Sequence, residues 1–199
     1  MPLRDRKRQA VRTEVIAVAV DLFLDHGYEA VTVDQIAAAA GLSSRSFFRY
    51  FANKEAVFTQ LLDETGTGIA ERLAGRPPHE EPWLALRRAF DDVIEMLDDD
   101  DEENRRSLRT MRLIYDTPAL YGSHLWKQTQ WNRLLADALT SRPAATPSAE
   151  QRLHAGALAA AAVACFEYAR AEWVDCGGTR PVSELLDLAM GAVHPLPDA

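Results

Sequence analysis

The segment from Thr32 to Phe51 restricts the fold of this chain more than any other. It reads TVDQIAAAAGLSSRSFFRYF. A small residue, Ala37, is followed four positions later by Gly41 and six positions after that by Phe47. Two short helices cross closely when a small residue lies at their contact, a glycine with positive φ forms the turn, and an apolar residue anchors the second helix. The spacing therefore predicts a helix-turn-helix. Its other inner-face residues are Ile36, Leu42 and Phe51.

Capping residues and helical periodicity extend this interpretation along the whole chain. Thr32 and Gln35 form a capping box before the first of the two short helices, and Ser43 is the expected N-cap of the second. Strand-forming residues are scarce and Ala is abundant, which favours helix. We therefore expect an all-α protein with about nine helices. Their expected ranges are 8–26, 32–41, 43–50, 53–73, 83–97, 105–117, 118–140, 148–175 and 183–193.

The outer face of the second short helix carries the candidate DNA contacts, because a helix-turn-helix places this helix in the major groove. Arg45, near the helix start, can present two donors to guanine O6 and N7. Tyr50 and Lys54 can bond to phosphate oxygens. The predicted DNA-contacting residues are Thr32, Ser43, Ser44, Arg45, Ser46, Phe48, Arg49, Tyr50 and Lys54. Further candidate contacts to phosphates or the minor groove are Arg4, Arg6, Lys7 and Arg8.

The formal charge of the chain is unevenly divided. The net charge is −8, which argues against nucleic acid if the charge is taken as evenly spread. Residues 1–54, however, carry a net +2 and the remainder carries −10. We therefore expect an anionic partner to bind the N-terminal quarter, with the acidic remainder repelling DNA elsewhere.

At these positions the sequence resembles the TetR family of transcriptional regulators. The resemblance covers about the first 60 residues. The matching blocks, in family order and spacing, are Leu22-Phe23, Gly27-Tyr28, Thr32 to Ala37, Ala40 to Ser43, Phe47 to Phe51, and Asn53-Lys54-Glu55. The resemblance implies a homodimer of all-helical subunits that binds double-stranded operator DNA, most often a repressor that a small ligand releases from a palindromic operator.

The resemblance also assigns roles to individual residues. Family base contacts fall on Ser44 and Arg45, and in part on Ser46. Phosphate contacts fall on Thr32, Ser46, Tyr50 and Lys54. Phe48 stands where the family usually has Tyr, so a hydroxyl that normally reaches phosphate is missing.

Two domains are expected, a three-helix DNA-binding domain over residues 1–52 and a regulatory domain for ligand binding and dimerisation over 53–199. The end of the chain, with an Ala-rich helix, Trp173 and Gly177-Gly178, resembles regulators that bind acyl-CoA-like or other lipophilic ligands. An unknown small lipophilic effector is therefore the expected ligand.

Aromatic residues suggest where that ligand binds, since ligand cavities between helices are largely apolar. The candidate pocket residues are Trp83, Phe90, Met111, Tyr115, Tyr121, Trp126, Trp131 and Phe166. The alternative is that these side chains form ordinary core.

The long helix over 148–175 is apolar on more than one face, so both sides need a covering surface. A second subunit is the expected cover on one side, because two-fold dimers are common and suit a palindromic operator. The alternative is a fully internal helix. The candidate dimer-interface residues are Ala157, Ala161, Ala164, Tyr168, Leu185 and Leu188.

No pattern of side chains predicts catalysis, a cofactor or a metal. Catalytic triads and paired carboxylates are not indicated, and the histidines lack metal-ligand spacing. Cys165 and Cys176 are too far apart along one helix for a disulfide. No signal peptide or membrane span is predicted, so a cytoplasmic protein is expected. The remaining alternative is a helical ligand-binding or enzymatic module that does not act on DNA.

Two further features carry weaker predictions. The acidic run over residues 98–103 is predicted to be a solvated loop, because it lacks regular cation-ligand spacing. Gly66 and Gly68 interrupt the fourth helix, where each glycine costs about 1 kcal/mol relative to Ala. We expect this point to be soft, which would let a bound ligand tilt the N-terminal helices.

Overall fold

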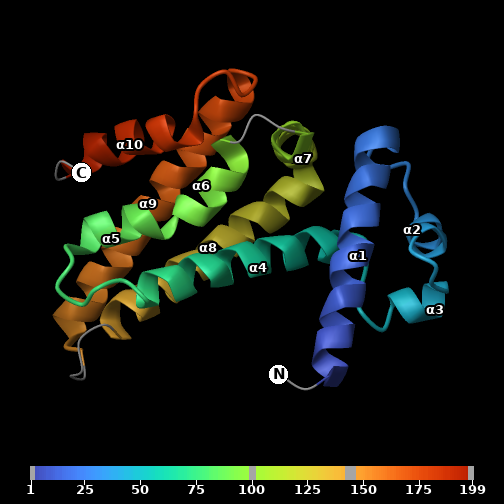
Figure 1. Ribbon diagram of the computed structural model, residues 1–199, viewed down its shortest axis with the longest axis horizontal. Helices are drawn as coiled ribbons and strands as arrows, with labels where there is room; N and C mark the ends of the chain where they lie inside the picture. The colour runs from blue at the N-terminus through green and yellow to red at the C-terminus, as the bar shows by residue number, and fades with distance from the viewer. Residues whose placement is uncertain (1–2, 99–101, 142–146, 197–199) are drawn as a thin grey trace. The chain divides into compact units, whose positions relative to one another are not determined.

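The computed structural model describes residues 3–98, 102–141 and 147–196, and within these ranges all regular structure is helical. Ten helices are formed there (Figure 1). They are α1 (Leu3–His26), α2 (Val33–Ala39), α3 (Ser44–Phe47), α4 (Glu55–Ala74), α5 (Pro82–Ala89), α6 (Asp91–Asp98), α7 (Glu102–Asp116), α8 (Pro118–Ser141), α9 (Ala149–Asp175) and α10 (Val182–Val193). Two compact units arise, one from residues 1–62 with 112–124 and one from 63–111 with 125–199.

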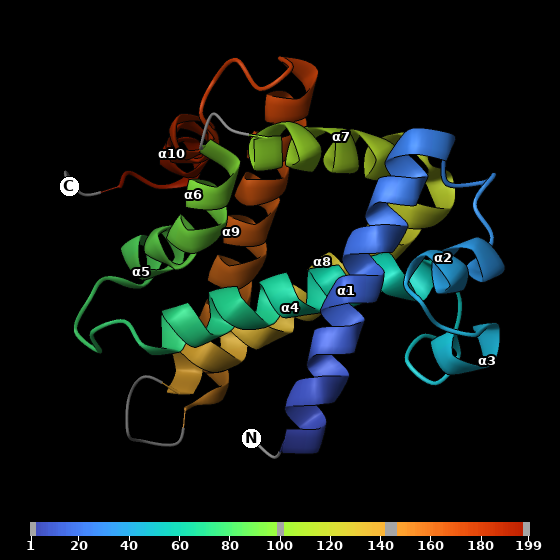
Figure 2. The ribbon, with the colours of Figure 1, turned by 45° about the vertical axis from the view of Figure 1, so that its right-hand side comes forward.

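In the first unit, α2 and α3 pack beside one another and lie on one side of α1 (Figure 2). The core contains an aromatic cluster, with Phe23 at 5.1 Å from Tyr28 and 5.3 Å from Phe58 between ring centroids. Helix α1 begins at Leu3, five positions before the expected start near Arg8. The added segment, LRDRK, contains no Gly or Pro, so nothing in its sequence interrupts the helix.

In the second unit, α10 packs along α9, and α5 contacts both of them (Figure 1). Phe90 and Phe166 stack at 4.5 Å between ring centroids and are both fully buried. Such aromatic pairs combine a large buried apolar area with a favourable ring geometry. One face of α9 is therefore core. Its buried members include Ala162, Phe166, Ala169 and Trp173.

The acidic run contributes a cap to a distant helix. Helix α10 starts after Pro181, which offers no side-chain hydrogen bond at the N-cap. Asp98 supplies it instead, because its carboxylate accepts from the backbone N–H of Val182 at 2.5 Å and of Ser183 at 3.1 Å. A carboxylate at this end also suits the helix dipole. The loop predicted over 98–103 is wrong at both ends, because Asp98 is the last residue of α6 and α7 begins at Glu102. Residues 99–101 lie outside the described residues.

The single helix expected over 83–97 is two helices in the structure, α5 and α6, separated at Phe90. The terminal carbonyls of a helix need donors from elsewhere. Arg72 of α4 provides one, because its Nε donates to the carbonyl oxygen of Arg88 at 3.1 Å. The donor at this helix end thus comes from a side chain sixteen residues away in sequence, a contact that local periodicity does not reveal.

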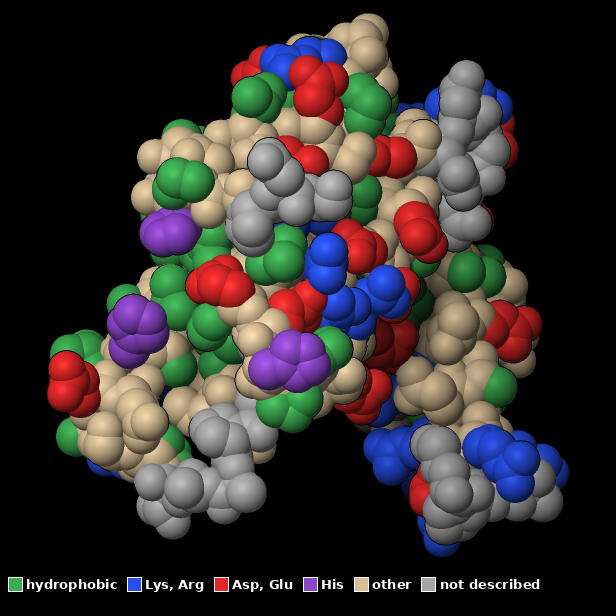
Figure 3. All heavy atoms as spheres, turned by 60° about the vertical axis from the view of Figure 1, so that its left-hand side comes forward, with side chains coloured by type: hydrophobic (Ala, Val, Ile, Leu, Met, Phe, Trp, Pro, Cys, Tyr) green, Lys and Arg blue, Asp and Glu red, His purple; other side chains and the backbone are tan. Residues whose placement is uncertain are grey.

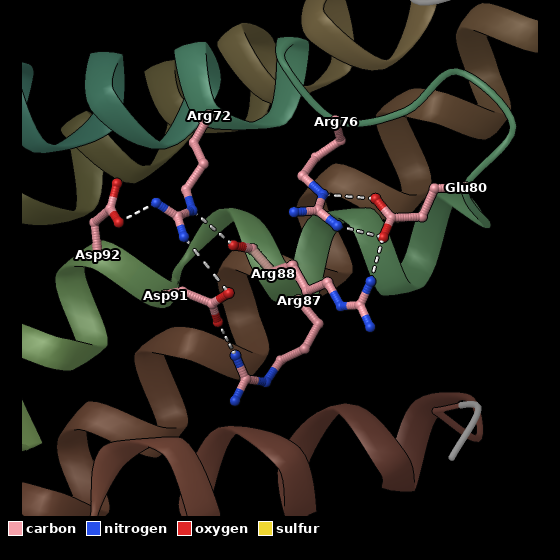
Figure 4. Close-up of polar contacts among 7 residues, drawn as sticks. All are labelled: Arg72, Arg76, Glu80, Arg87, Arg88, Asp91 and Asp92. Carbon is pink, nitrogen blue, oxygen red and sulfur yellow. Dashed lines mark hydrogen bonds and ion pairs between the residues drawn. The ribbon is translucent and has the colours of Figure 1, made fainter. Parts of the chain in front are cut away.

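A polar network joins the end of α4, the following loop, α5 and α6 (Figure 4). Glu80 lies at its centre, between the guanidinium groups of Arg76 and Arg88. Asp91 accepts from Arg87 at 2.8 Å and lies 3.8 Å from Arg72, which also pairs with Asp92. On the face drawn in Figure 3, basic and acidic side chains are accordingly interleaved at the middle. Each buried or half-buried charge in this network therefore has an opposite partner, as burial requires.

Gly66 allows a close contact within the second unit. A Cβ atom built at this position would lie 2.1 Å from Nε1 of Trp131, a buried side chain of α8. No heavy atom lies within 4 Å of a Cβ built at Gly68. The two glycines therefore differ. Gly66 is required for packing against Trp131, so replacing it would change packing as well as helix flexibility. Replacing Gly68 would change helix flexibility without a steric clash.

The described helices do not include one that is long and apolar enough to cross a membrane. Cys165 and Cys176 are both free thiols, as their separation predicts. Burial raises the pKa of the Cys165 thiol above its ordinary value.

Candidate nucleic-acid interface

The turn between α2 and α3 has the geometry that the spacing predicts. Gly41 has a φ of +66°, in the left-handed region that favours glycine. The following N–H, of Leu42, donates to the carbonyl of Ala37 at 2.8 Å and closes the turn. Ala37 and Phe47 are buried where the two helices meet. The inner face of the helix-turn-helix is therefore confirmed. Ile36 and Phe51 are also buried, and Leu42 is half-buried.

Side chains at both helix starts are engaged in capping. Thr32 Oγ1 accepts from the Gln35 N–H at 3.3 Å, and Gln35 Oε1 accepts from the Thr32 N–H at 2.8 Å. Ser43 Oγ accepts from the Ser46 N–H at 3.2 Å. The predicted capping box at Thr32 is thus present. Thr32 and Ser43, predicted to contact DNA, therefore also fix the starts of the two helices.

Helix α3 is shorter than expected. It ends at Phe47, whereas the sequence suggests a helix through Tyr50. The next turn tightens, because the N–H of Arg49 donates to the Ser46 carbonyl and that of Tyr50 to the Phe47 carbonyl, both three residues back. Such bonds are common at helix ends. The polar residues after Phe47 are therefore displayed on a tight turn.

The outer face of α3 is open to solvent at the positions predicted to contact bases. Arg45 is exposed, and Ser44 and Ser46 are half-buried. Ser44 Oγ donates to Asp34 Oδ1 of α2 at 2.5 Å, which orients its hydroxyl. Phe48 is 56% exposed, a large apolar side chain left uncovered within its unit. An exposed apolar group can contact a thymine methyl, but it cannot donate the hydrogen bond to phosphate that a Tyr hydroxyl would give.

Tyr50 is held by arginines on two sides. Arg49 Nη2 donates to the Tyr50 hydroxyl at 3.2 Å, and the Arg49 guanidinium lies 5.1 Å from the ring centroid. Arg12 Nη2 of α1 donates to the Tyr50 carbonyl at 3.2 Å. Sequence reasoning missed Arg12 because its partner is thirty-eight positions away. The turn after α3 is thus tied to α1.

Lys54 has a structural role in addition to its predicted contact with phosphate. Its Nζ donates to the carbonyl of Tyr28 at 2.8 Å and of Val31 at 3.3 Å, and lies 4.2 Å from the Tyr28 ring centroid. The pKa of Tyr28 is raised, first because the phenol is buried and second because Glu55 and Glu29 are near. Lys54 therefore joins the start of α4 to the turn before α2.

The predicted pocket residues are only partly brought together. Phe90 and Phe166 stack, and Tyr115 and Tyr121 lie 6.0 Å apart between ring centroids. Trp126 is 60% exposed. Arg170, missed by the sequence reasoning, is buried with its guanidinium 4.5 Å from the Phe166 centroid and 5.7 Å from that of Trp131. Buried side chains of this set are Trp83, Phe90, Met111, Trp131 and Phe166.

A cavity of about 580 Å³ opens elsewhere in the second unit, and none of the predicted pocket residues lines it. Its walls come from the loop before α5, the end of α8 and the start of α9. Leu139, Ala155 and Leu158 contribute apolar surface, and Glu150 and His154 contribute polar groups. Its position could not be predicted because three segments distant in sequence form it. The described residues contain no cluster of three or more His, Cys, Asp or Glu suited to a metal.

The predicted interface residues mostly lie on an uncovered face of α9 and α10. Tyr168 is 77% and Leu188 is 58% exposed, and Leu153, which was not predicted, is 75% exposed. Ala157 and Ala164 are exposed, and Ala161 is half-buried. Leu185 differs, because it is 5% exposed and belongs to the core of its own unit.

Comparison with known proteins places this geometry in a family. Residues 15–61 match the family described as bacterial regulatory proteins, tetR family, and residues 80–195 match the MftR C-terminal domain. The chain is 34% identical over 143 residues to the HTH-type transcriptional regulator TcmR of Streptomyces glaucescens, an alignment that covers 70% of this chain and 63% of TcmR.

The alignment with a second relative covers a larger share of that relative than the alignment with TcmR does. The putative mycofactocin biosynthesis transcriptional regulator MftR of Mycobacterium tuberculosis is 30% identical over 141 residues, which are 69% of this chain and 68% of MftR. The crystal structure of FadR from Bacillus subtilis in complex with stearoyl-CoA has the same fold, with a TM-score of 0.58, 17% identity, and coverage of 93% of this chain and 99% of FadR. The chain therefore belongs to the TetR family of bacterial DNA-binding transcriptional regulators, with a C-terminal domain of the MftR type.

Proposed function

We propose that the protein acts in the cytoplasm as a ligand-responsive homodimeric repressor of a palindromic operator. The observation that carries the proposal is the exposed Arg45 on a helix whose start is capped and whose inner face is buried. In this proposal residues 1–52 form the DNA-binding domain and residues 53–199 form the regulatory domain. Regulators of this family are generally not enzymes, which supports a role in binding without catalysis.

The proposed DNA contacts follow from exposure and hydrogen-bonding capacity. Arg45 donates to a guanine edge, and Ser44 and Ser46 bond to bases or phosphates. Tyr50, Arg49 and Lys54 neutralise or bond to phosphate oxygens. Thr32 and Ser43, which cap the starts of α2 and α3, complete the proposed set of phosphate contacts.

The proposed dimer uses the uncovered face of α9 and α10. Exposed apolar side chains of this size, gathered on adjacent helices, are typical of interfaces. Tyr168, Leu188 and Leu153 provide large contact surfaces, and Ala157 and Ala164 allow two helices to approach closely. A two-fold dimer made through this face would present two α3 helices to the two halves of a palindrome.

The proposed effector is a small lipophilic molecule bound in the second unit. The stearoyl-CoA complex of FadR supports a lipophilic ligand, and the cavity of about 580 Å³ lies within the usual range of ligand sites, about 300–1,000 Å³. Among the residues that the structure describes, those that line this cavity include no Lys or Arg. The phosphates of coenzyme A need cationic partners. We therefore expect a lipophilic ligand without phosphates to bind this cavity more tightly than an acyl-CoA.

A salt titration of DNA binding tests the regulator function. The probe is a duplex selected by the protein from a random library. With about 6–10 phosphate contacts, affinity should fall by about 10³-fold or more between 50 and 200 mM salt. Absent binding, or binding indifferent to salt, would favour the alternative, a helical ligand-binding or enzymatic module that does not act on DNA. Thermal shifts with stearic acid and with stearoyl-CoA then test the effector class.

A further inference from the structure

The cavity of about 580 Å³ in the second unit has an apolar wall and a polar wall. Leu139 of α8, together with Ala155 and Leu158 of α9, forms the apolar wall. The α9 positions that line the cavity include 151, 154, 155 and 158. This is the i, i+3, i+4, i+7 spacing of one helix face. An alkyl or aromatic group of a ligand would lie against this face, because removing apolar surface from water is favourable.

This face of α9 is separate from the face proposed for dimerisation. Leu153 and Ala157 each lie two positions from Ala155, which is a rotation of about 200° around the helix. Ala155 is accordingly buried, whereas Leu153 and Ala157 are exposed. The cavity would therefore stay open in a dimer formed through the other face, and a small molecule suits it better than the second subunit.

The polar wall consists mainly of hydrogen-bond acceptors. Ionised carboxylates offer only acceptor oxygens, and a neutral imidazole offers one acceptor and one donor. The Thr140 hydroxyl already donates to the carbonyls of Ala136 and Asp137, both at 3.0 Å. A ligand therefore has to bring donors of its own. The lining residues that carry these groups are His79, Glu80, Glu81, Thr140, Glu150 and His154.

The three carboxylates of this wall differ in the partners that they already have. Glu80 is 8% exposed and is held by Arg76 and Arg88 (Figure 4). Glu81 and Glu150 are exposed, and within the described ranges neither forms an ion pair with a Lys, Arg or His side chain. A cation that enters the cavity would therefore pair with Glu81, before α5, and with Glu150, in the first turn of α9.

Two helix starts also lie at this cavity, and their partial positive charges favour an anion. Each partial charge is about half an elementary charge. One amide at each start is already bonded, since the Leu84 N–H donates to Glu81 at 2.8 Å and the Gln151 N–H donates to Ser148 at 3.1 Å. The full charges of the Glu81 and Glu150 carboxylates together exceed the two partial charges. The groups that face a ligand therefore favour a cation.

We propose that this cavity binds a lipophilic amine in its protonated form. The proposal rests on the regulatory function proposed above and names the chemical class of the ligand. The apolar body of the amine lies against Leu139, Ala155 and Leu158, and its ammonium group donates to Glu81 and Glu150. A protonated amine has donors and no acceptor, which matches a wall of acceptors. Hydrogen bonds between two charged groups are also stronger than neutral ones.

Three probes of equal chain length test the class of ligand: decylamine, 1-decanol and decanoic acid. At about pH 7 the first is a cation, the second is neutral and the third is an anion. Isothermal titration calorimetry measures the affinity of each for the full-length protein. We expect decylamine to bind about tenfold more tightly than decanol, because two exposed ion pairs contribute up to about fivefold each. Decanoic acid should bind most weakly.

The variants Glu81→Gln and Glu150→Gln each remove one charge and keep an acceptor oxygen at the helix start. Each should weaken the binding of decylamine by about two- to fivefold and leave that of decanol unchanged. Glu172→Gln is the matched control. Glu172 is exposed, does not line the cavity and lies about 33 Å from Glu150 along α9, so its replacement should change neither affinity.

Three further variants locate the bound probe. Leu158→Trp and Thr140→Trp obstruct the cavity from two different helices and should weaken the binding of all three probes. Arg152, which does not line the cavity, donates to the carbonyl of the lining residue Pro147 at 2.7 Å. Arg152→Gln removes a positive charge near the ammonium site, so it should tighten the binding of decylamine. Circular dichroism confirms that each variant is folded.

The outcomes separate the class of ligand from the regulator function. If decanol or decanoic acid binds as tightly as decylamine, or if Glu81→Gln and Glu150→Gln behave like Glu172→Gln, the amine proposal is overturned and the cavity remains the effector site. If no probe binds, or if folded Leu158→Trp and Thr140→Trp proteins bind as the wild type does, the cavity itself is rejected as the site. Selection of a duplex is measured without any probe, and its failure would reject the regulator function alone.

Discussion

Arg76 binds both carboxylate oxygens of Glu80, with Nε 2.7 Å from Oε2 and Nη2 2.6 Å from Oε1. Arg88 donates to Oε1 as well, at 2.7 Å. The Glu80 side chain is only 8% exposed, so its charge depends on these two partners. The end of α4, the loop and α5 are therefore joined through one carboxylate.

Glu80→Gln should lower the free energy of unfolding by about 1–3 kcal/mol, because hydrogen bonds to charged groups contribute more than neutral ones. This loss is smaller than that expected for a fully buried ion pair, because the Arg76 and Arg88 side chains are 24% and 39% exposed. Urea denaturation measures the change. Glu184→Gln is the matched control, because its bond to Arg180 is exposed and should contribute less than about 1 kcal/mol. Equal losses in the two variants would contradict the special role of Glu80.

The same carboxylate predicts a dependence of stability on acid. The pKa of Glu80 is lowered from its ordinary value of 4.5, mainly by the hydrogen bond from Arg76 and further by that from Arg88. A lowered folded-state pKa stabilises the fold above the unfolded pKa and ceases to do so as pH falls through the folded pKa. The stability difference between wild type and Glu80→Gln should be constant near neutral pH and shrink below pH 4.5. Urea titrations across pH 3–7 should detect this, and a difference independent of pH would refute it.

Gly66→Ala and Gly68→Ala should have opposite effects on thermal stability. The first places a methyl group against Trp131, and such overpacking costs about 1–3 kcal/mol. The second meets no atom within 4 Å and should stabilise the helix by about 1 kcal/mol. Melting temperatures distinguish them. The softness hypothesis is then tested with Gly68→Ala alone: an unchanged effector response on DNA would reject it.

Arg45→Ala and Lys54→Ala should separate sequence recognition from general affinity. Arg45→Ala should cost about 1–3 kcal/mol and relax the preference at one base position. Lys54→Ala should weaken binding to all duplexes alike. It should also lower the melting temperature of the free protein, because Lys54 bonds to two backbone carbonyls. Binding to a panel of single-base operator variants measures sequence preference and general affinity, and thermal melts measure stability. A Lys54→Ala protein of wild-type stability would contradict the structural role of Lys54.

Tyr168→Glu should convert a dimer into monomers. The side chain is 77% exposed on the proposed interface, and a charge there would be buried without a partner. Light scattering after gel filtration measures the mass. Met96→Glu, which changes a 54% exposed side chain on α6, is the control and should remain dimeric. A dimeric Tyr168→Glu protein would place the interface elsewhere.

The α2–α3 pair was predictable because its signals are local. The capping box of Thr32 and Gln35, the positive φ of Gly41 and the burial of Phe47 each depend on residues within one or two turns. The break at Phe90 was not predictable, since it involves Arg72 on another helix. The cap on α10 likewise comes from Asp98, eighty-four positions before Val182.

The candidate DNA contacts followed from the sequence, but their additional structural bonds did not. Lys54 bonds to carbonyls twenty-three and twenty-six positions away, and no spacing rule connects them. The cavity in the second unit was missed for the same reason. Its walls are neither the most aromatic nor the most apolar segments of the chain, so composition gives no indication of it.

The helical start of α1 has a consequence for the kinetics of DNA binding. A disordered arm would have to become ordered on DNA, at about 1–2 kcal/mol of backbone entropy per residue. Residues 3–10 are already helical. Their charges therefore act on DNA as a fixed field during the first diffusional encounter. Shortening the chain from its N-terminus should therefore slow association, with a smaller effect on dissociation from the bases.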